Sequence, residues 1–109
     1  MEIYMTKKYI INRLLELKPA LTKEGFIIVG IFGSYAREDY TKNSDIDILY
    51  TLIDPHKFTK KNGGFGAFTK IREMKDFLAN EFGKSIDFVE KSSLSRTGRK
   101  YILEDLVRV

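Results

Sequence analysis

The stretch that decides the fold is residues 33–47, which read GSYAREDYTKNSDID. A glycine–serine pair opens it, an aspartate–x–aspartate triplet closes it, and ten residues separate the two. Continuously apolar and β-branched residues fill 26–32 just before it, and a similar run continues beyond the triplet to residue 51. Runs of this kind are typical of buried strands. The sequence therefore predicts that strands at 26–32 and 46–51 frame the polar stretch.

Asp45 and Asp47 are expected on one face of the second strand, because side chains alternate across a strand. Aspartate is disfavoured in strands, and such local contradictions tend to occur at functional sites. Two neighbouring carboxylates stay ionised together only when a positive charge joins them. Magnesium does this well, since it commonly takes one or two carboxylates together with substrate phosphates. Two interpretations remain open here: a divalent-metal site, or a strand with one solvated face.

Asp87 is a third aspartate inside an apolar strand, predicted at residues 86–89. If this strand lies beside that of Asp45 and Asp47, three carboxylates converge at one edge of the sheet. Two metal ions held there could clamp the attacking and leaving oxygens of an in-line displacement. Asp87 could also accept the proton of an acceptor hydroxyl. The alternative is an ordinary exposed strand residue.

The Gly33-Ser34 pair supplies a possible anion site. A strand that turns through glycine into a helix start leaves backbone N–H groups pointing outwards, which suits a triphosphate. Ser34 can add a hydroxyl donor or cap the helix, and Arg37, one turn further on, can reach a phosphate. Alone, such a pair is usually only a turn. Combined with the aspartate triplet at this spacing and with strands on both sides, it predicts a nucleotide-binding site.

The remaining pattern alternates helices and strands. Helical spacing predicts helices over 5–17, 68–82 and 99–107, a second short helix from Pro19 to a stop at Gly25, and another after Gly33-Ser34. Residues 54–67 hold a proline, several lysines and the three glycines of Gly63-Gly64-Phe65-Gly66, so they are the least ordered part by composition. The stretch from Lys57 to Lys70 is interpreted as a mobile loop over the active site, in preference to a nucleic-acid surface.

Length and composition limit the function. The 109 residues, 43% hydrophobic and 31% charged, predict one globular domain over 1–109. No apolar run approaches the roughly 20 residues that span a bilayer, and Met1-Glu2-Ile3-Tyr4-Met5 lacks the order of a signal peptide. The absence of cysteine fits a reducing cytoplasm, the expected location. The net charge of +4 is scattered, so nucleic acid is not expected as a direct partner.

These motifs resemble the minimal nucleotidyltransferases of the DNA polymerase β superfamily. The core of that family is Gly-Ser, ten residues, Asp-x-Asp, and a third carboxylate on a later strand. The resemblance implies an α/β (α+β) nucleotidyltransferase fold with a small mixed β-sheet flanked by helices. It also implies ATP as the donor and one or two Mg²⁺ ions. The catalytic and metal-binding residues would be Asp45, Asp47 and Asp87; the nucleotide would be bound by Gly33, Ser34, Arg37 and Ser44.

The chain departs from the family pattern after Arg37. Where relatives usually carry glycine and glutamate, this sequence has Glu38 and Asp39. The spacing is kept, so the main loss is backbone freedom at Glu38. Two other residues are given plain roles. His56, the only histidine, is expected at the surface, and Tyr35 is interpreted as packing at a helix start and not as a base-stacking or self-modified residue.

Stand-alone domains of this length resemble the antitoxin half of toxin–antitoxin pairs whose toxin is an all-helical HEPN ribonuclease. The resemblance implies transfer of AMP from ATP to a tyrosine of that toxin, within a complex of the two proteins. Association of this chain with copies of itself is a further possibility. The alternatives are a catalytically idle antitoxin that neutralises its toxin by contact, and the same chemistry on a small molecule or an RNA end. The retained three-carboxylate set argues against the idle form.

Overall fold

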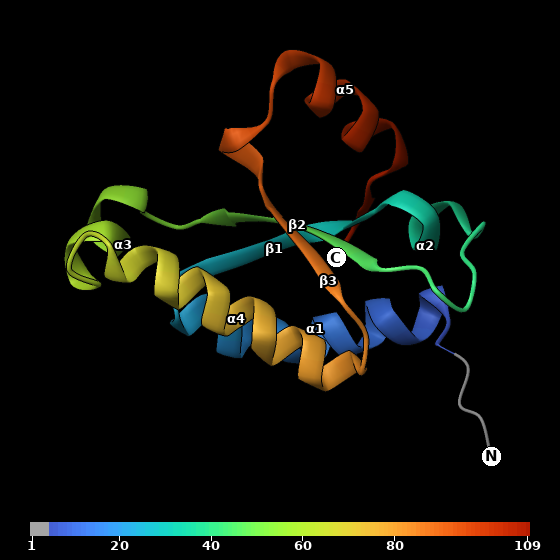
Figure 1. Cartoon of the computed structure of the whole chain (residues 1–109), viewed down its shortest axis with the longest axis horizontal. Coiled ribbons are helices and arrows are strands. Elements are labelled where there is room, and N and C mark those ends of the chain that lie inside the picture. Colours follow the sequence, from blue (N-terminus) through green and yellow to red (C-terminus); the bar gives the residue numbers. More distant parts are fainter. Residues whose placement is uncertain (1–4) are drawn as a thin grey trace.

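Four strands form one mixed sheet in the computed structural model, which describes residues 5–109 (Figure 1). The strands are β1 (Phe26–Phe32), β2 (Ile46–Leu52), β3 (Ile86–Glu90) and β4 (Val107–Arg108). The helices are α1 (Lys7–Lys23), α2 (Gly33–Arg37), α3 (Pro55–Lys61), α4 (Gly66–Phe82), the 3₁₀ turn η1 (Lys91–Ser93) and α5 (Arg96–Asp105). The expectation that the N-terminus is not a signal peptide concerns mainly residues 1–4, which lie outside the described residues.

The sheet order is β3-β2-β1-β4. β1 is antiparallel to both β2 and β4, whereas β2 and β3 run parallel. Parallel neighbours need a crossover connection, which α3 and α4 provide here. The expected fold class, a small mixed sheet flanked by helices, is confirmed.

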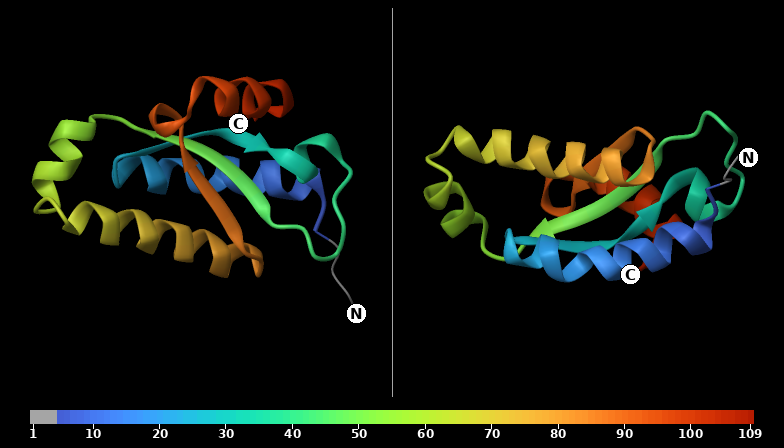
Figure 2. Two further views of the ribbon diagram at one scale, coloured as in Figure 1. Left: turned by 45° about the horizontal axis from the view of Figure 1, so that its top comes forward. Right: turned by 90° about the horizontal axis from the view of Figure 1, so that it is seen from below.

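The core lies between the sheet and the α1–α4 pair. These two helices lie side by side on one face, and α5 lies on the other (Figure 2). Alternate strand residues point into this core, and α1 contributes one buried residue per turn; the buried set includes Phe26, Ile28, Ile46, Ile48, Tyr50, Ile10, Leu14, Leu17 and Leu21. By contrast, α5 buries no residue. The second face of the sheet is therefore only partly covered.

Pro19 does not divide the first helical segment, contrary to the expected break into two helices. α1 continues from Lys7 to Lys23 with Pro19 inside it. A proline in a helix leaves the carbonyl four residues earlier without its N–H partner. Here that residue is Leu15, which is exposed, as is Pro19. Solvent can satisfy the carbonyl, and the apolar side of the helix stays in register with the sheet.

Residues 54–67 are not the loop that their composition predicts. Asp54 caps α3 by accepting a hydrogen bond from the N–H of Lys57 at 3.0 Å, and Pro55 opens the helix. Phe58 is buried against Phe26, with ring centroids 5.3 Å apart. The segment follows β2 at the end of the sheet remote from α2 (Figure 1). The interpretation as a mobile loop over the active site is therefore wrong.

The C-terminal segment also differs from the prediction of a helix over 99–107. Ser95 caps α5 by accepting from the N–H of Gly98, so the helix begins at Arg96 and ends at Asp105. Val107 and Arg108 then form β4 against β1. No helix within residues 5–109 has the length and apolar character needed to cross a bilayer.

Candidate active site

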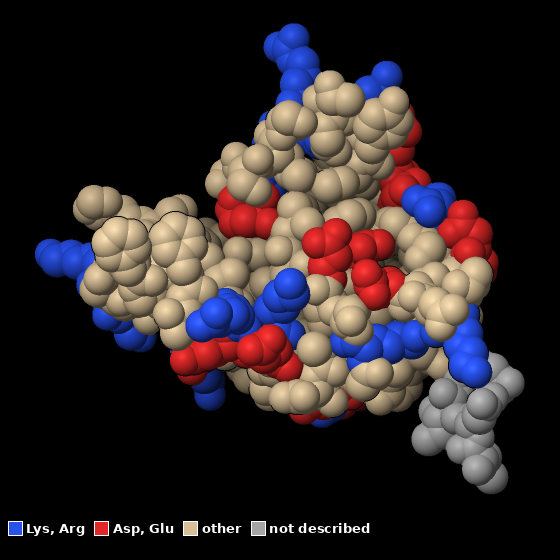
Figure 3. Space-filling model, viewed as in Figure 1, with Lys and Arg blue, Asp and Glu red and all other residues tan. Residues whose placement is uncertain are grey.

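Asp47 and Asp87 lie side by side on neighbouring parallel strands. They are paired in the β2–β3 register, and their neighbours Ile46, Ile48 and Ile86 are buried in the core on the other face. Alternation therefore directs both carboxylates to the partly covered face. Figure 3 shows acidic side chains gathered in the middle of this face, between β3 and α2. The expected juxtaposition of the two strands is present.

The pKa of Asp47 is shifted by its surroundings in this cluster. Burial raises the pKa of its carboxyl to about 6, and the charges of Asp87 and Asp45 add to the effect. Arg37 acts in the opposite direction but does not cancel it. Asp45 itself is exposed, just before β2 begins. The site thus holds negative charge that the protein leaves uncompensated, as a cation-binding site does.

The donor set fits a hard divalent cation. Within residues 5–109, no three histidine, cysteine or carboxylate side chains lie close enough to enclose a metal ion by themselves. Magnesium, however, usually takes only one or two carboxylates and completes its shell with water and substrate phosphates. Asp47 and Asp87 offer such a pair of oxygen ligands, with the charge of Asp45 acting on Asp47.

Gly33 touches the carboxylate of Asp47. A Cβ at this position would lie 2.0 Å from Asp47 Oδ2, and its φ of +73° falls in the left-handed region. Only glycine meets both conditions without strain. The turn from β1 into α2 is therefore built directly against the acidic pair, and Ser34, half-buried, follows it. The carbonyl of Ser34 accepts the N–H of Asp39 at 3.1 Å and so closes α2.

Glu38 is the residue at which the chain departs from the family pattern. It adopts φ 66° and ψ 23° as the C-cap of α2, a left-handed conformation that favours glycine. Glutamate therefore replaces glycine at a position whose backbone conformation favours glycine. The ten residues between Ser34 and Asp45 nonetheless match the family pattern, and Gly33 lies directly against Asp47.

The guanidinium of Arg37 is held by two carboxylates in this structure. Its Nε donates to Asp39 Oδ2 at 3.0 Å, and its Nη1 donates to Asp105 Oδ2 at 2.6 Å. Arg37 thereby ties α2 to the end of α5, while its charge still acts on Asp47. A role in binding phosphate remains a prediction.

Ser44 organises the loop that precedes Asp45. Its hydroxyl accepts the N–H of Thr41 at 2.8 Å, and its own N–H donates to the Thr41 carbonyl at 3.1 Å. Lys84 braces the same loop, because its Nζ donates to the carbonyls of Lys42 at 3.0 Å and Ser44 at 3.5 Å. Sequence reasoning missed Lys84. No sequence motif marks Lys84. Its role is seen only in the structure, where the turn before β3 lies beside the loop that precedes Asp45.

Tyr35 and His56 lie where the sequence predicted, Tyr35 in the packing at a helix start and His56 at the surface. Tyr35 is 1% exposed and stacks on Tyr40 with ring centroids 4.3 Å apart, so it packs at the start of α2. His56 is exposed on α3.

Comparison with known proteins adds sequence evidence to this geometry. A family model described as "Nucleotidyltransferase domain" matches residues 7–109. A Methanocaldococcus jannaschii protein named "putative protein adenylyltransferase" is 30% identical over 102 residues, covering 91% of this chain and 94% of its own. The "Protein adenylyltransferase MntA" of Thermococcus cleftensis is 31% identical over 81 residues, covering 74% and 72%.

Two solved structures are similar in fold. One, described as a "putative minimal nucleotidyltransferase", has a TM-score of 0.75 at 19% identity and covers 99% of this chain and 100% of its own. The other is described as a toxin–antitoxin with AMP-PNP. It has a TM-score of 0.62 at 23% identity and covers 95% of this chain and 72% of its own. At these identities the likeness concerns the fold alone.

Proposed function

This chain belongs to the nucleotidyltransferase domain family, and on that premise we propose that it transfers AMP from ATP to a hydroxyl group of a partner protein. The acceptor we propose is a tyrosine of a HEPN-type toxin, which the transfer silences. The observation that carries the proposal is the pairing of Asp47 with Asp87 across two parallel strands, directly beside Gly33. Relatives named as protein adenylyltransferases and a toxin–antitoxin structure with AMP-PNP support it.

The residue roles follow from charge and position. Asp45, Asp47 and Asp87 would hold one or two Mg²⁺ ions, which neutralise charge on the triphosphate when bound. Gly33 and Ser34 would position the phosphates beside Asp47, and Ser44 would order the loop that carries Asp45. The acceptor oxygen attacks the α-phosphorus, its bond to phosphorus forms as the bond to pyrophosphate breaks, and the hydroxyl proton passes to Asp87.

Asp87 suits the role of proton acceptor because it is exposed. An acceptor hydroxyl can therefore approach it from solvent. Arg37 would contribute through its positive charge, either from its present place beside Asp39 and Asp105 or after release to a phosphate. The cytoplasm, which supplies ATP and Mg²⁺, is the compartment that this proposal requires.

An idle antitoxin that acts by contact alone is the alternative of a different class. The acidic cluster argues against it, because burial and the neighbouring carboxylates raise the pKa of Asp47, and ionising this carboxyl at neutral pH lowers the stability of the fold. A module that only binds would gain nothing from them. Transfer to a small molecule or an RNA end uses the same residues, and only the acceptor differs.

The test is intact mass spectrometry of a co-purified helical toxin partner after incubation with this protein, ATP and Mg²⁺. We expect a mass gain of whole AMP units on the partner. Asp45→Ala/Asp47→Ala should abolish it, as should Asp47→Asn alone, whereas Asp76→Ala, at an exposed carboxylate of α4, should leave it unchanged. A stable complex without mass gain would favour neutralisation by binding. Near wild-type activity in Asp47→Asn would refute the metal-site assignment.

A further inference from the structure

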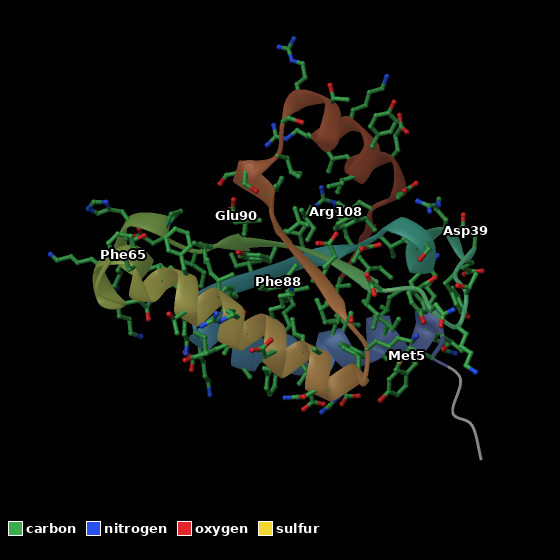
Figure 4. All side chains as sticks on the ribbon, in the orientation of Figure 1. Met5, Asp39, Phe65, Phe88, Glu90 and Arg108 are labelled. Atoms are coloured by element: carbon green, nitrogen blue, oxygen red, sulfur yellow. The ribbon has the colours of Figure 1, made fainter. Side chains whose placement is uncertain are left out.

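Two phenylalanines project from the end of the molecule where α3 meets α4. Phe65 is 88% exposed and Phe68 is 72% exposed, and we call this pair the aromatic tip. Gly63 and Gly64, with φ of +70° and +75°, make the turn that carries it, and a Cβ on either would meet no atom within 4 Å. Figure 4 shows Phe65 at this extremity, directed away from the sheet. Such exposure of large aromatic groups marks interaction sites.

The helix that precedes the aromatic tip carries positive charge. α3 presents Lys57, Lys60 and Lys61, and no carboxylate within residues 5–109 lies at ion-pair distance from them. Lys70 differs, because it is paired with Glu24 at 2.6 Å. Beside α3 opens a cavity of about 210 Å³ with Ile53 and Phe58 in its wall and with Lys57 and Lys61 among its lining residues. Glu24 and Asp54 also line this cavity, and the charge of Lys61 acts on Glu24. The end of the molecule thus combines protruding apolar groups, a recess and lysines that outnumber the nearby carboxylates.

The aromatic tip and the acidic cluster can be related in one view of the molecule. Figure 4 labels Phe65 at the α3–α4 end, and Figure 3, in the same orientation, shows carboxylates gathered near the middle of the visible face. The longest dimension of the chain is 43 Å, and β2 leads from Asp47 towards α3. A protein lying on this face could therefore contact the tip and present a hydroxyl at the aspartates together.

We propose that the aromatic tip docks the protein acceptor of the nucleotidyl transfer. The complementary surface is an apolar pocket bordered by carboxylates, placed beside the acceptor hydroxyl; this inference rests on the proposed function. Buried aromatic anchors dominate the energy of protein interfaces, and lysines that form no ion pair within this chain select an acidic rim and accelerate encounter. A projecting tip fits a protein pocket better than single-stranded nucleic acid, which needs a groove with stacking platforms.

The test compares Phe65→Ala/Phe68→Ala with the wild type. Labelling with an alkyne-tagged ATP in the native lysate identifies the acceptor, which is then purified. We expect the variant to bind the purified acceptor at least tenfold more weakly and to show a higher KM for the acceptor, while kcat at saturating acceptor stays unchanged. Lys60→Gln/Lys61→Gln should slow association and weaken its dependence on salt. Leu15→Ala, 49% exposed on α1, is the matched control and should behave as the wild type.

Each other outcome overturns the inference in a distinct way. If the double phenylalanine variant labels and binds the acceptor as the wild type does, the tip is not the docking site, and the proposed function stands. If the wild type binds AMP-PNP with Mn²⁺ but labels no protein, the protein acceptor and its docking surface both fail. If loss of the phenylalanines instead abolishes binding to single-stranded RNA or to anionic phosphatidylserine vesicles, the tip serves another ligand. Thermal unfolding of each variant verifies that it is folded.

Discussion

Gly33 shows how closely a single residue is adapted to the site. A Cβ there would meet Asp47 Oδ2 at 2.0 Å, whereas a Cβ at Gly83, also with positive φ, would meet nothing within 4 Å. We expect Gly83→Ala to lower the free energy of unfolding by about 1 kcal/mol through backbone strain alone. Gly33→Ala should lower it by roughly 3 kcal/mol because a steric clash is added, and should abolish transfer. Urea unfolding measures both, and equal losses would contradict the close approach.

Asp47 should make stability depend on pH in a defined direction. Its pKa is about 6 in the folded chain against 3.8 as the ordinary value, so the folded state binds its proton more tightly. Its contribution therefore favours folding at low pH and is lost as pH rises through 6.

Asp47→Asn, which mimics the protonated carboxyl, should stabilise the metal-free chain above pH 6. Solvent screening at this half-buried position limits the gain to about 1 kcal/mol. Below pH 4 the gain should disappear, because the wild-type carboxyl is protonated as well. Unfolding in EDTA at pH 7.5 and pH 4.0 tests this, with Asp76→Asn as a control that should show no such difference. A gain of the same size at both pH values would show that charge is not its cause.

Sequence reasoning also identified Asp47, Asp87 and Gly33. The aspartates stand out because they contradict the propensity of apolar strands, and Gly33 stands out because a glycine–serine turn after a buried strand leaves backbone N–H groups free for an anion. It could not find Lys84. That side chain acts through the carbonyls of Lys42 and Ser44, which any residue type would offer. The engagement of Arg37 by Asp105 was equally hidden, since the two are 68 residues apart.

Among the elements, strands with strong apolar runs were predicted most closely. The interval 26–32 matches β1, and 46–51 and 86–89 each fall one residue short of β2 and β3. The missed elements have physical reasons. α3 is short, and its Asp54-Pro55 start was outweighed by the lysines and glycines that follow. β4 has only two residues, and it exists because β1 offers a free edge.

Gly30 is the residue on which β4 depends. A Cβ at this position would lie 2.1 Å from the carbonyl oxygen of Val107. Gly30→Ala should therefore displace β4 and lower the free energy of unfolding by roughly 2–3 kcal/mol. Gly66→Ala, whose nearest atom would be Asn62 Cβ at an ordinary 3.8 Å, is the matched control and should be nearly neutral. Hydrogen exchange of the Val109 amide, which donates to Val29 at 3.0 Å, reports the displacement.

Over the whole molecule, local stability should be lower in α5, on the partly covered face of the sheet, than in the buried strand β2. β2 is buried along most of its length, whereas α5 buries no residue and is tied to α2 through the Arg37–Asp105 ion pair. We expect amide hydrogens of α5 to exchange faster than those of β2, because exposed segments open locally. Asp105→Asn should accelerate exchange in α5 and leave β2 unchanged. Uniform protection across both elements would contradict this gradient.

The pairing of β4 with β1 also sets an order of events during synthesis on the ribosome. Gly30 and Ile31 leave the ribosome long before their partners Arg108 and Val107, and contacts of such large sequence separation form late in folding. The nascent chain therefore carries an exposed strand edge on β1 until α5 has been translated. Chaperones that recognise unpaired edges have that interval in which to act, and mutations that prolong it would favour aggregation before they alter the finished protein.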